Sequence, residues 1–157
     1  MSRDGAPPPR MCYGCGAENE HGLHMEFRRE GDRTVCDFTP VEFTQGYPGR
    51  MHGGVVSTMI DEAMGWAVYH SKKWGTTARL AVRYRRPVDL SSRLRVEAWI
   101  TNERHRLIEL RAQVRDESGQ LLADSEGTYM LLDPRTASML SALARHVGRE
   151  DAPEVVP

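Results

Sequence analysis

The hydrophobic positions of this chain repeat with two different periods. Between Gly53 and about Tyr69 there is no proline, and the apolar residues follow helical spacing. These residues are Val56, Met59, Ile60, Ala63, Met64 and Ala67. Because residues three and four positions apart share one face of a helix, the pattern predicts a long helix with one buried side.

After Gly75 the period becomes two, which is typical of strands that are buried on one face. The apolar positions of three such strands are Ala78, Leu80, Val82 and Tyr84, then Leu94, Val96, Ala98 and Ile100, then Ile108, Leu110, Ala112 and Val114. A last strand is expected over residues 121–132, and a first hairpin over residues 23–28 and 34–38. Short turns favour antiparallel pairing. The pattern predicts an α+β fold, with one long helix packed on five or six antiparallel strands.

The chain divides into three expected parts. Residues 1–11 are polar and rich in proline, and we expect a flexible leader there. Residues 12–134 form the domain that carries the long helix and the strands. Residues 135–157 are expected to hold a short helix from Ala137 to Val147 and a frayed tail from Asp151 onward.

Composition and charge exclude several classes of protein. The formal net charge is −1, so the chain as a whole offers no general attraction for nucleic acid. No apolar run approaches the ~20 residues that a membrane helix needs. The N-terminus also lacks the apolar centre of a secretory signal. The sequence therefore predicts a cytoplasmic protein with no nucleic-acid or membrane partner.

The three cysteines raise the question of a metal or redox site. Cys12 and Cys15 form a Cys-x-x-Cys pair, and His21 and His24 follow closely. Only five residues separate Cys15 from His21, against about a dozen in an ordinary zinc finger. The pair also does not open a helix after a strand, as a thioredoxin-like redox pair does. We therefore expect a compact turn and no metal.

The start of the long helix is a candidate anion site. The first backbone N–H groups of a helix have no partner inside it, and the helix dipole makes that end positive. His52-Gly53-Gly54 places two residues without side chains there, so a ligand can approach those N–H groups. Such an end suits a carbonyl oxygen or an oxyanion. The alternative is a plain glycine-rich helix entry that His52 caps.

Asp61 is unusual because aspartate is unfavourable inside a helix. It shares a narrow face with Gly54, Ser57 and Gly65, whereas Glu62 is expected nearer the solvent. The alternative for Asp61 is a solvated surface carboxylate. Eight residues of helix separate Asp61 from Gly53, which is ~12 Å along the axis. One substrate carbonyl cannot touch both within one chain, so a shared site requires a symmetric dimer.

Several motifs in order resemble the hot-dog-fold acyl-CoA thioesterases, in the branch of the phenylacetic-acid-pathway enzymes. They are Cys12-x-x-Cys15-Gly16, residues 45–49, His52-Gly53-Gly54, Asp61, Thr77 and residues 80–88. The likeness runs from about Cys12 to Asp133. It implies a helix wrapped by an antiparallel sheet, no cofactor, and homodimers that often pair into homotetramers.

The resemblance also implies roles for individual residues. Asp61 matches the nucleophile or general base, and Gly53 matches the oxyanion donor through its backbone N–H. His52 matches the residue that orients the thioester, and Thr77 the residue that places water or the carboxylate. The expected substrate-binding residues are Gln45, Gly54, Arg85 and Arg86. Gln45 stands where some relatives carry an asparagine, and the arginines are candidates for the CoA phosphates.

The expected function is hydrolysis of an acyl-CoA thioester to a carboxylic acid and CoA. One alternative is a hydratase or dehydratase of the same fold, although its usual signatures are missing from the sequence. The other is a module that binds acyl-CoA without turning it over. A fold alone does not decide between these activities.

Overall fold

The computed structural model describes residues 10–146, 148–150 and 152–154. Most of the expected leader, residues 1–9, lies outside them, as do Val147, Asp151 and residues 155–157. The strands are β1 (Arg28–Glu30), β2 (Arg33–Phe38), β3 (Gly75–Tyr84), β4 (Leu94–Arg104), β5 (Leu107–Asp116) and β6 (Leu121–Leu131). The helices are η1 (Glu42–Thr44), α1 (Gly53–His70) and α2 (Pro134–His146).

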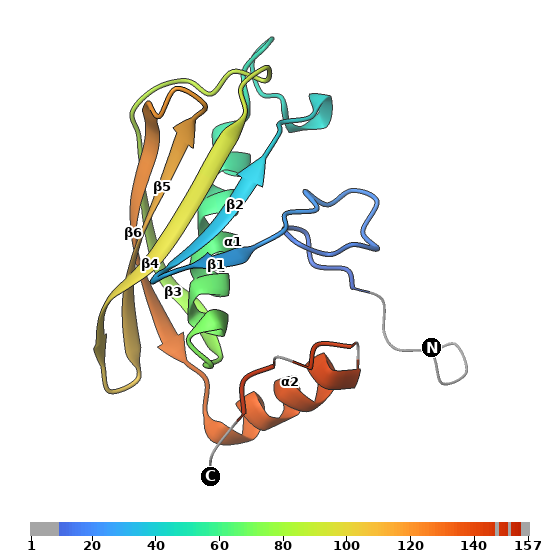
Figure 1. The fold of residues 1–157 in the computed structure, drawn as a ribbon, viewed down its shortest axis with the longest axis vertical. Helices are drawn as coiled ribbons and strands as arrows, with labels where there is room; N and C mark the ends of the chain where they lie inside the picture. The colour runs from blue at the N-terminus through green and yellow to red at the C-terminus, as the bar shows by residue number, and fades with distance from the viewer. Residues whose placement is uncertain (1–9, 147, 151, 155–157) are drawn as a thin grey trace.

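The six strands form one antiparallel sheet in the order β1-β2-β4-β5-β6-β3, and α1 lies along one face of it (Figure 1). Every apolar residue of the predicted helical stripe is buried. The stripe packs on the alternate apolar residues of β4 and β5, which are buried too. The predicted helix, with one buried side on an antiparallel sheet, is therefore confirmed.

Gly127 on β6 lets the helix approach the sheet. A Cβ at this position would lie 2.5 Å from Sδ of Met64, which is fully buried on α1. A real Cβ does not come so close, so the Met64 side chain would have to move to admit a larger residue here.

Two strand predictions need correction. The first strand was expected over residues 23–28, but β1 begins only at Arg28. The residues before it pair with the N-terminal loop, since Leu23 N–H donates to Tyr13 O and Met25 N–H donates to Gly14 O. In β3 the register with β6 shifts between Thr77 and Arg79, and Ala78 is exposed instead of sharing the inner face.

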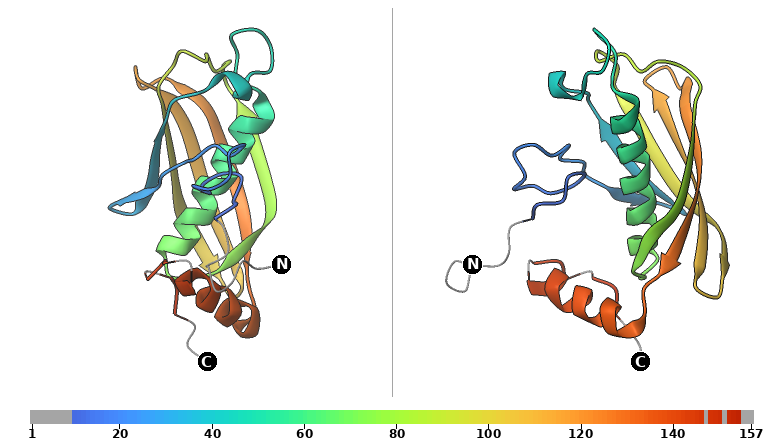
Figure 2. Two further views of the ribbon diagram at one scale, coloured as in Figure 1. Left: turned by 90° about the vertical axis from the view of Figure 1, so that its right-hand side faces the viewer. Right: turned by 180° about the vertical axis from the view of Figure 1, so that it is seen from behind.

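The C-terminal segment crosses the end of α1 (Figure 2). Helix α2 runs from Pro134, three residues earlier than expected, to His146. Beyond it, Ala152 is buried, and Pro153 O accepts a hydrogen bond of 2.6 Å from Ser141 on α2. Residues 152 and 153 are therefore packed and not frayed. Within the described residues, no helix combines the length and the apolar character that a bilayer crossing requires.

Candidate active site

Asp61 projects from the middle of α1 toward the edge strand β3 and its neighbour β6. Its Oδ1 accepts a hydrogen bond of 2.7 Å from the Thr77 hydroxyl and one of 2.6 Å from the Tyr129 hydroxyl. Thr77 on β3 and Tyr129 on β6 are register partners, so neighbouring strands hold the two hydroxyls side by side. Asp61 is half-buried and doubly bonded, which excludes the alternative of a solvated surface carboxylate.

The two oxygens of this carboxylate differ. Oδ1 accepts both hydroxyl hydrogen bonds, whereas Oδ2 accepts none from any residue that the structure describes. One oxygen therefore fixes the orientation of the side chain. The other is left to accept a proton or to attack an electrophile.

Tyr129 was missed by the sequence analysis. Its side chain is 2% exposed, and its hydroxyl also lies 2.7 Å from the backbone carbonyl of Asp61. Burial, together with the hydrogen bond to Asp61, raises the pKa of Tyr129 well above its usual range. The phenol therefore stays a donor at physiological pH. Tyr129 lies beside Thr77 because of the register between β3 and β6, which cannot be read from the sequence.

Asp61, Thr77 and Tyr129 lie in the wall of a cavity of about 530 Å³. Much of the lining is apolar and is built by Trp66, Tyr69, Trp74, Leu140 and Leu143. Basic residues at the same cavity are Arg10, Lys73 and Arg149. Its size and its mixture of apolar walls with a few polar groups are those of a small-molecule site.

The start of α1 shows the capping that was the alternative for His-Gly-Gly, and it also leaves one amide unpaired among the described residues. His52 is the N-cap residue, and its Nδ1 accepts a hydrogen bond of 2.9 Å from Gly54 N–H. The Gly54 amide is thus occupied, which makes it a poor substrate donor in this arrangement. Across the described residues, nothing accepts a hydrogen bond from Gly53 N–H. The Tyr84 hydroxyl donates to Gly53 O at 2.9 Å and so fixes this turn without covering the amide.

One chain does not bring Asp61 and Gly53 together. The cavity at Asp61 is lined by the middle and the end of α1, and residues 52–54 are not part of its lining. This agrees with the separation that helix geometry predicts. Within one chain, the carboxylate with its two hydroxyls thus lies apart from the Gly53 amide, which no described residue pairs.

The expected substrate-binding side chains outside the helix are largely engaged within the chain. Gln45 Oε1 accepts a hydrogen bond of 2.8 Å from Gly49 N–H and closes the turn before α1. Arg85 forms two hydrogen bonds with Asp124, at 3.1 and 2.8 Å. Arg86 is exposed and forms no ion pair with a described residue. Of the two arginines, Arg86 is therefore the more available for a phosphate.

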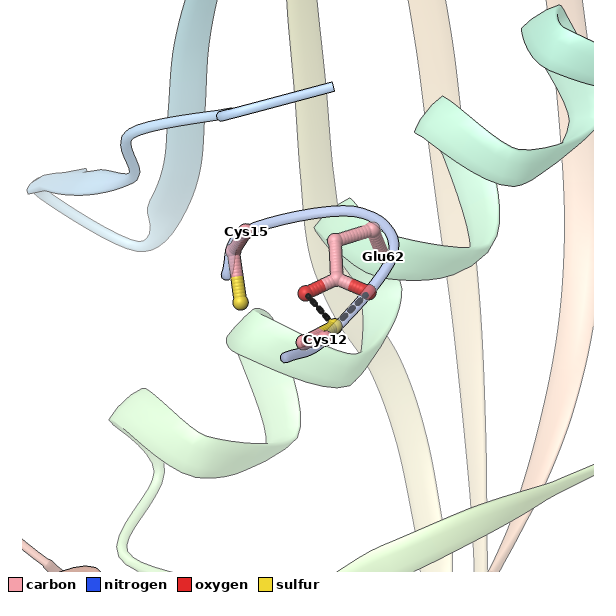
Figure 3. Close-up of side chains that lie close together, drawn as sticks. All are labelled: Cys12, Cys15 and Glu62. Atoms are coloured by element: carbon pink, nitrogen blue, oxygen red, sulfur yellow. Dashed lines mark hydrogen bonds between the residues drawn. The ribbon is translucent and has the colours of Figure 1, made fainter. Parts of the chain in front are cut away.

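Glu62 was expected nearer the solvent, and this prediction is wrong because the side chain is largely covered. The loop that carries Cys12 and Cys15 covers it (Figure 3). Cys12 Sγ lies 3.5 and 3.6 Å from the two carboxylate oxygens, and Trp66 Nε1 donates to Oε1 at 3.2 Å. Burial raises the pKa of Glu62, while the hydrogen bond from Cys15 lowers the pKa of Cys12 to about 5. His21 and His24 are not part of the cluster.

Comparison with known proteins gives consistent matches. The family model described as "Thioesterase superfamily" matches residues 48–123. The chain is 32% identical over 124 residues to the acyl-coenzyme A thioesterase THEM4 of Bos taurus, covering 76% of this chain and 51% of that protein. The chain spans about half the length of the curated relatives it matches.

Solved structures share the fold. A crystal structure of a thioesterase superfamily protein superposes with a TM-score of 0.74 at 29% identity, covering 77% of this chain and 60% of that one. A hypothetical thioesterase from Streptococcus pneumoniae, solved with coenzyme A, gives 0.65 at 18% identity, with coverage of 68% and 87%. The chain therefore has the hot-dog fold of these structures, and its residues 48–123 match the thioesterase superfamily.

Proposed function

We propose that this protein hydrolyses acyl-CoA thioesters, with Asp61 as the general base or nucleophile. The observation that carries the proposal is the carboxylate itself: Thr77 and Tyr129 anchor Oδ1, and Oδ2 is left without a partner among the described residues at the wall of an apolar-sided cavity. A fixed carboxylate with one unengaged oxygen suits proton abstraction from water. THEM4 of Bos taurus is named an acyl-CoA thioesterase, and the pneumococcal structure holds coenzyme A, which supports the substrate class.

The proposed chemistry needs an oxyanion donor opposite the carboxylate. Water attacks the thioester carbonyl carbon while Asp61 takes its proton, and the carbonyl oxygen becomes an oxyanion. The C–S bond then breaks, CoA leaves as a thiolate that takes up a proton, and the acyl group leaves as a carboxylic acid. In the alternative course, Asp61 attacks first, and water hydrolyses the resulting anhydride. The Gly53 amide is the donor that this chain offers for the oxyanion.

We propose that this amide comes from a second subunit. Strand β3 lies at the edge of the sheet, pairs only with β6 among the described strands, and is exposed over most of its length. Natural proteins seldom leave so long an edge unpaired. Pairing of two such edges would join two subunits, and the symmetry would repeat each contact twice. A homodimer could thus oppose the Asp61 cluster of one subunit to the Gly53 amide of the other.

Thiol release from a panel of acyl-CoA substrates tests the function. Replacing Asp61 with asparagine should lower kcat by roughly 10²–10⁴-fold, because general-base assistance is lost while the hydrogen bonds to Oδ1 can persist. Asp32→Asn, in the exposed turn between β1 and β2, is the matched control and should leave kcat unchanged. Turnover by Asp61→Asn close to that of the control would contradict the assignment.

The same panel separates the alternative activities. A hydratase or dehydratase would change the alkene absorbance of an enoyl or hydroxyacyl substrate without releasing thiol. A binding module would retain acyl-CoA in equilibrium dialysis without turnover and would be indifferent to Asp61→Asn. Either result would replace the thioesterase proposal.

A further inference from the structure

The N-terminal loop presents two thiols to a carboxylate on the central helix. Cys12 and Cys15 come from the loop and Glu62 comes from α1, fifty positions after Cys12, and the fold places the three groups side by side (Figure 3). Their sulfur and oxygen atoms all lie within 4.8 Å of one another. Thioester hydrolysis as proposed above uses none of the three.

The loop is shaped to hold this arrangement. A Cβ on Gly14 would lie 2.5 Å from Cδ of Glu62, and a Cβ on Gly16 would lie 2.4 Å from the Arg10 carbonyl oxygen. Glycine is therefore required at Gly16, where the close atoms are backbone, whereas a side chain at Gly14 would displace the Glu62 carboxylate. The turn is closed by Gly16 N–H donating to Cys12 O at 2.9 Å. The two thiols are thus positioned by the backbone before any ligand binds.

Glu62 lacks a positive partner. Its carboxylate is partly buried, yet no Lys, Arg or His among the residues that the structure describes forms a salt bridge with it. Its partners are Cys12 and the Trp66 indole, which carry no positive charge. A buried carboxylate without a counter-charge is costly, and a bound cation removes that cost.

We propose that Cys12, Cys15 and Glu62 bind a zinc ion that fastens the N-terminal loop to α1. In a tetrahedral site with Zn–S of about 2.3 Å and Zn–O of about 2.1 Å, sulfur and oxygen ligands lie about 3.6 Å apart. Cys12 Sγ lies 3.5 and 3.6 Å from the Glu62 oxygens. This pair therefore already has the spacing of two zinc ligands, and the Cys15 thiol lies within 4.8 Å of both groups.

The chemistry of the donors selects the metal. Two thiolates favour a soft or borderline cation and exclude magnesium and calcium, which prefer oxygen ligands. Zinc accepts thiolate sulfur and carboxylate oxygen together, and water would complete its four ligands. From the sequence, His21 and His24 were the candidate ligands beside the two cysteines. In the fold, Glu62 lies under the loop and takes their place, and both histidines lie outside the cluster.

The site adjoins the cavity that holds Asp61. Cys15 and Glu62 are lining residues of that cavity, and Glu62 follows Asp61 on α1. Zinc would hold the loop as part of the cavity wall. The proposal does not depend on thioester hydrolysis, because metal binding is measured without substrate.

The test measures metal in the purified full-length protein, made in zinc-supplemented medium without a histidine tag. We expect about one zinc per chain by elemental mass spectrometry. Cys15→Ser and Glu62→Gln should each raise the Kd for zinc by about 100-fold or more, measured by competition with a chromophoric chelator. Cys36→Ser is the matched control, since Cys36 is the buried third cysteine on β2, and it should bind zinc like the unaltered protein.

Cobalt substitution keeps the test decisive if a variant fails to fold. The unaltered protein loaded with Co²⁺ should show thiolate-to-metal charge transfer and the intense visible bands of tetrahedral cobalt. Zinc well below one per chain, with no such cobalt spectrum, would overturn the proposal. A disulfide between Cys12 and Cys15 in freshly purified protein, found by mass spectrometry of peptides, would overturn it as well and would indicate a redox pair.

Discussion

At the scale of single residues, the candidate site depends on how one carboxylate is held. Asp61 is short and lies inside a helix, where it would otherwise compete for backbone groups. Thr77 and Tyr129 satisfy Oδ1 from two neighbouring strands. The side chain therefore has a defined orientation without a charged partner, and Oδ2 keeps its capacity to accept a proton.

Tyr129→Phe tests this support through both activity and stability. Loss of one hydrogen bond to the carboxylate should lower kcat by roughly tenfold. The pKa of Tyr129 is raised from its ordinary 10, so above pH 10 the folded protein keeps a proton that the unfolded chain loses. The folded state then binds more protons, and the free energy of unfolding falls as pH rises.

Removing the phenol should flatten that decline by up to ~1.4 kcal/mol per pH unit. Thermal unfolding of both proteins between about pH 9 and pH 11 measures the difference. The thiols of the half-buried Cys15 and the buried Cys36, whose pKa values are raised too, contribute equally to both proteins. If kcat is unchanged and the free energy of unfolding falls with pH as steeply as in the unaltered protein, Tyr129 does not support Asp61.

The sequence identified part of this residue-scale picture. Asp61 and Thr77 were predicted because each stands within a motif of the family. Tyr129 could not be found, since its role arises from the pairing of β3 with β6. Glu62 was misplaced because helical periodicity says nothing about a distant loop that folds over the helix.

At the scale of elements, the first two backbone amides of α1 differ in whether they have a hydrogen-bond acceptor. His52 satisfies the Gly54 amide, and the Gly53 amide is left without an acceptor in the described part of the chain. Gly53 is the first helical residue, a position that tolerates proline because its N–H is not needed by the helix. His52 has a ψ of 133°, which is also the extended conformation that a following proline requires.

Gly53→Pro should therefore delete one amide donor without breaking the helix. We expect kcat to fall by roughly 10²–10³-fold, as in the loss of an oxyanion donor, with Tm close to that of the unaltered protein. Gly53→Ala is the matched control, because it keeps the N–H and its Cβ would meet the Tyr84 ring at an ordinary 3.5 Å. Equal turnover by the two variants would remove the Gly53 amide from the mechanism.

Element prediction succeeded where periodicity was regular. The 18 residues of α1 and the three strands β4 to β6 follow their hydrophobic patterns closely. It failed at Ala78, because a bulge leaves this residue without a partner on β6, and Thr77 takes the place opposite Tyr129. It also failed before β1, where Leu23 and Met25 are buried by the N-terminal loop instead of by strand pairing.

At the scale of the whole molecule, one chain keeps the two groups of the proposed site apart. The Asp61 cavity and the Gly53 amide lie at different positions along α1, and β3 offers an exposed edge beside the first of them. The sequence predicted this separation, because eight residues of helix place Gly53 and Asp61 ~12 Å apart along the axis. The central claim of the account is that the active site forms only when two subunits meet.

Mixing two inactive variants tests that claim most directly. In a heterodimer of Asp61→Asn with Gly53→Pro, one site receives the intact carboxylate and the intact amide, and the other receives neither. After unfolding and refolding of an equimolar mixture, with heterodimers verified by native mass spectrometry, thiol release should recover to roughly a quarter of the unaltered activity. Activity no greater than the mean of the two separate variants, with heterodimers present, would contradict a site shared between subunits.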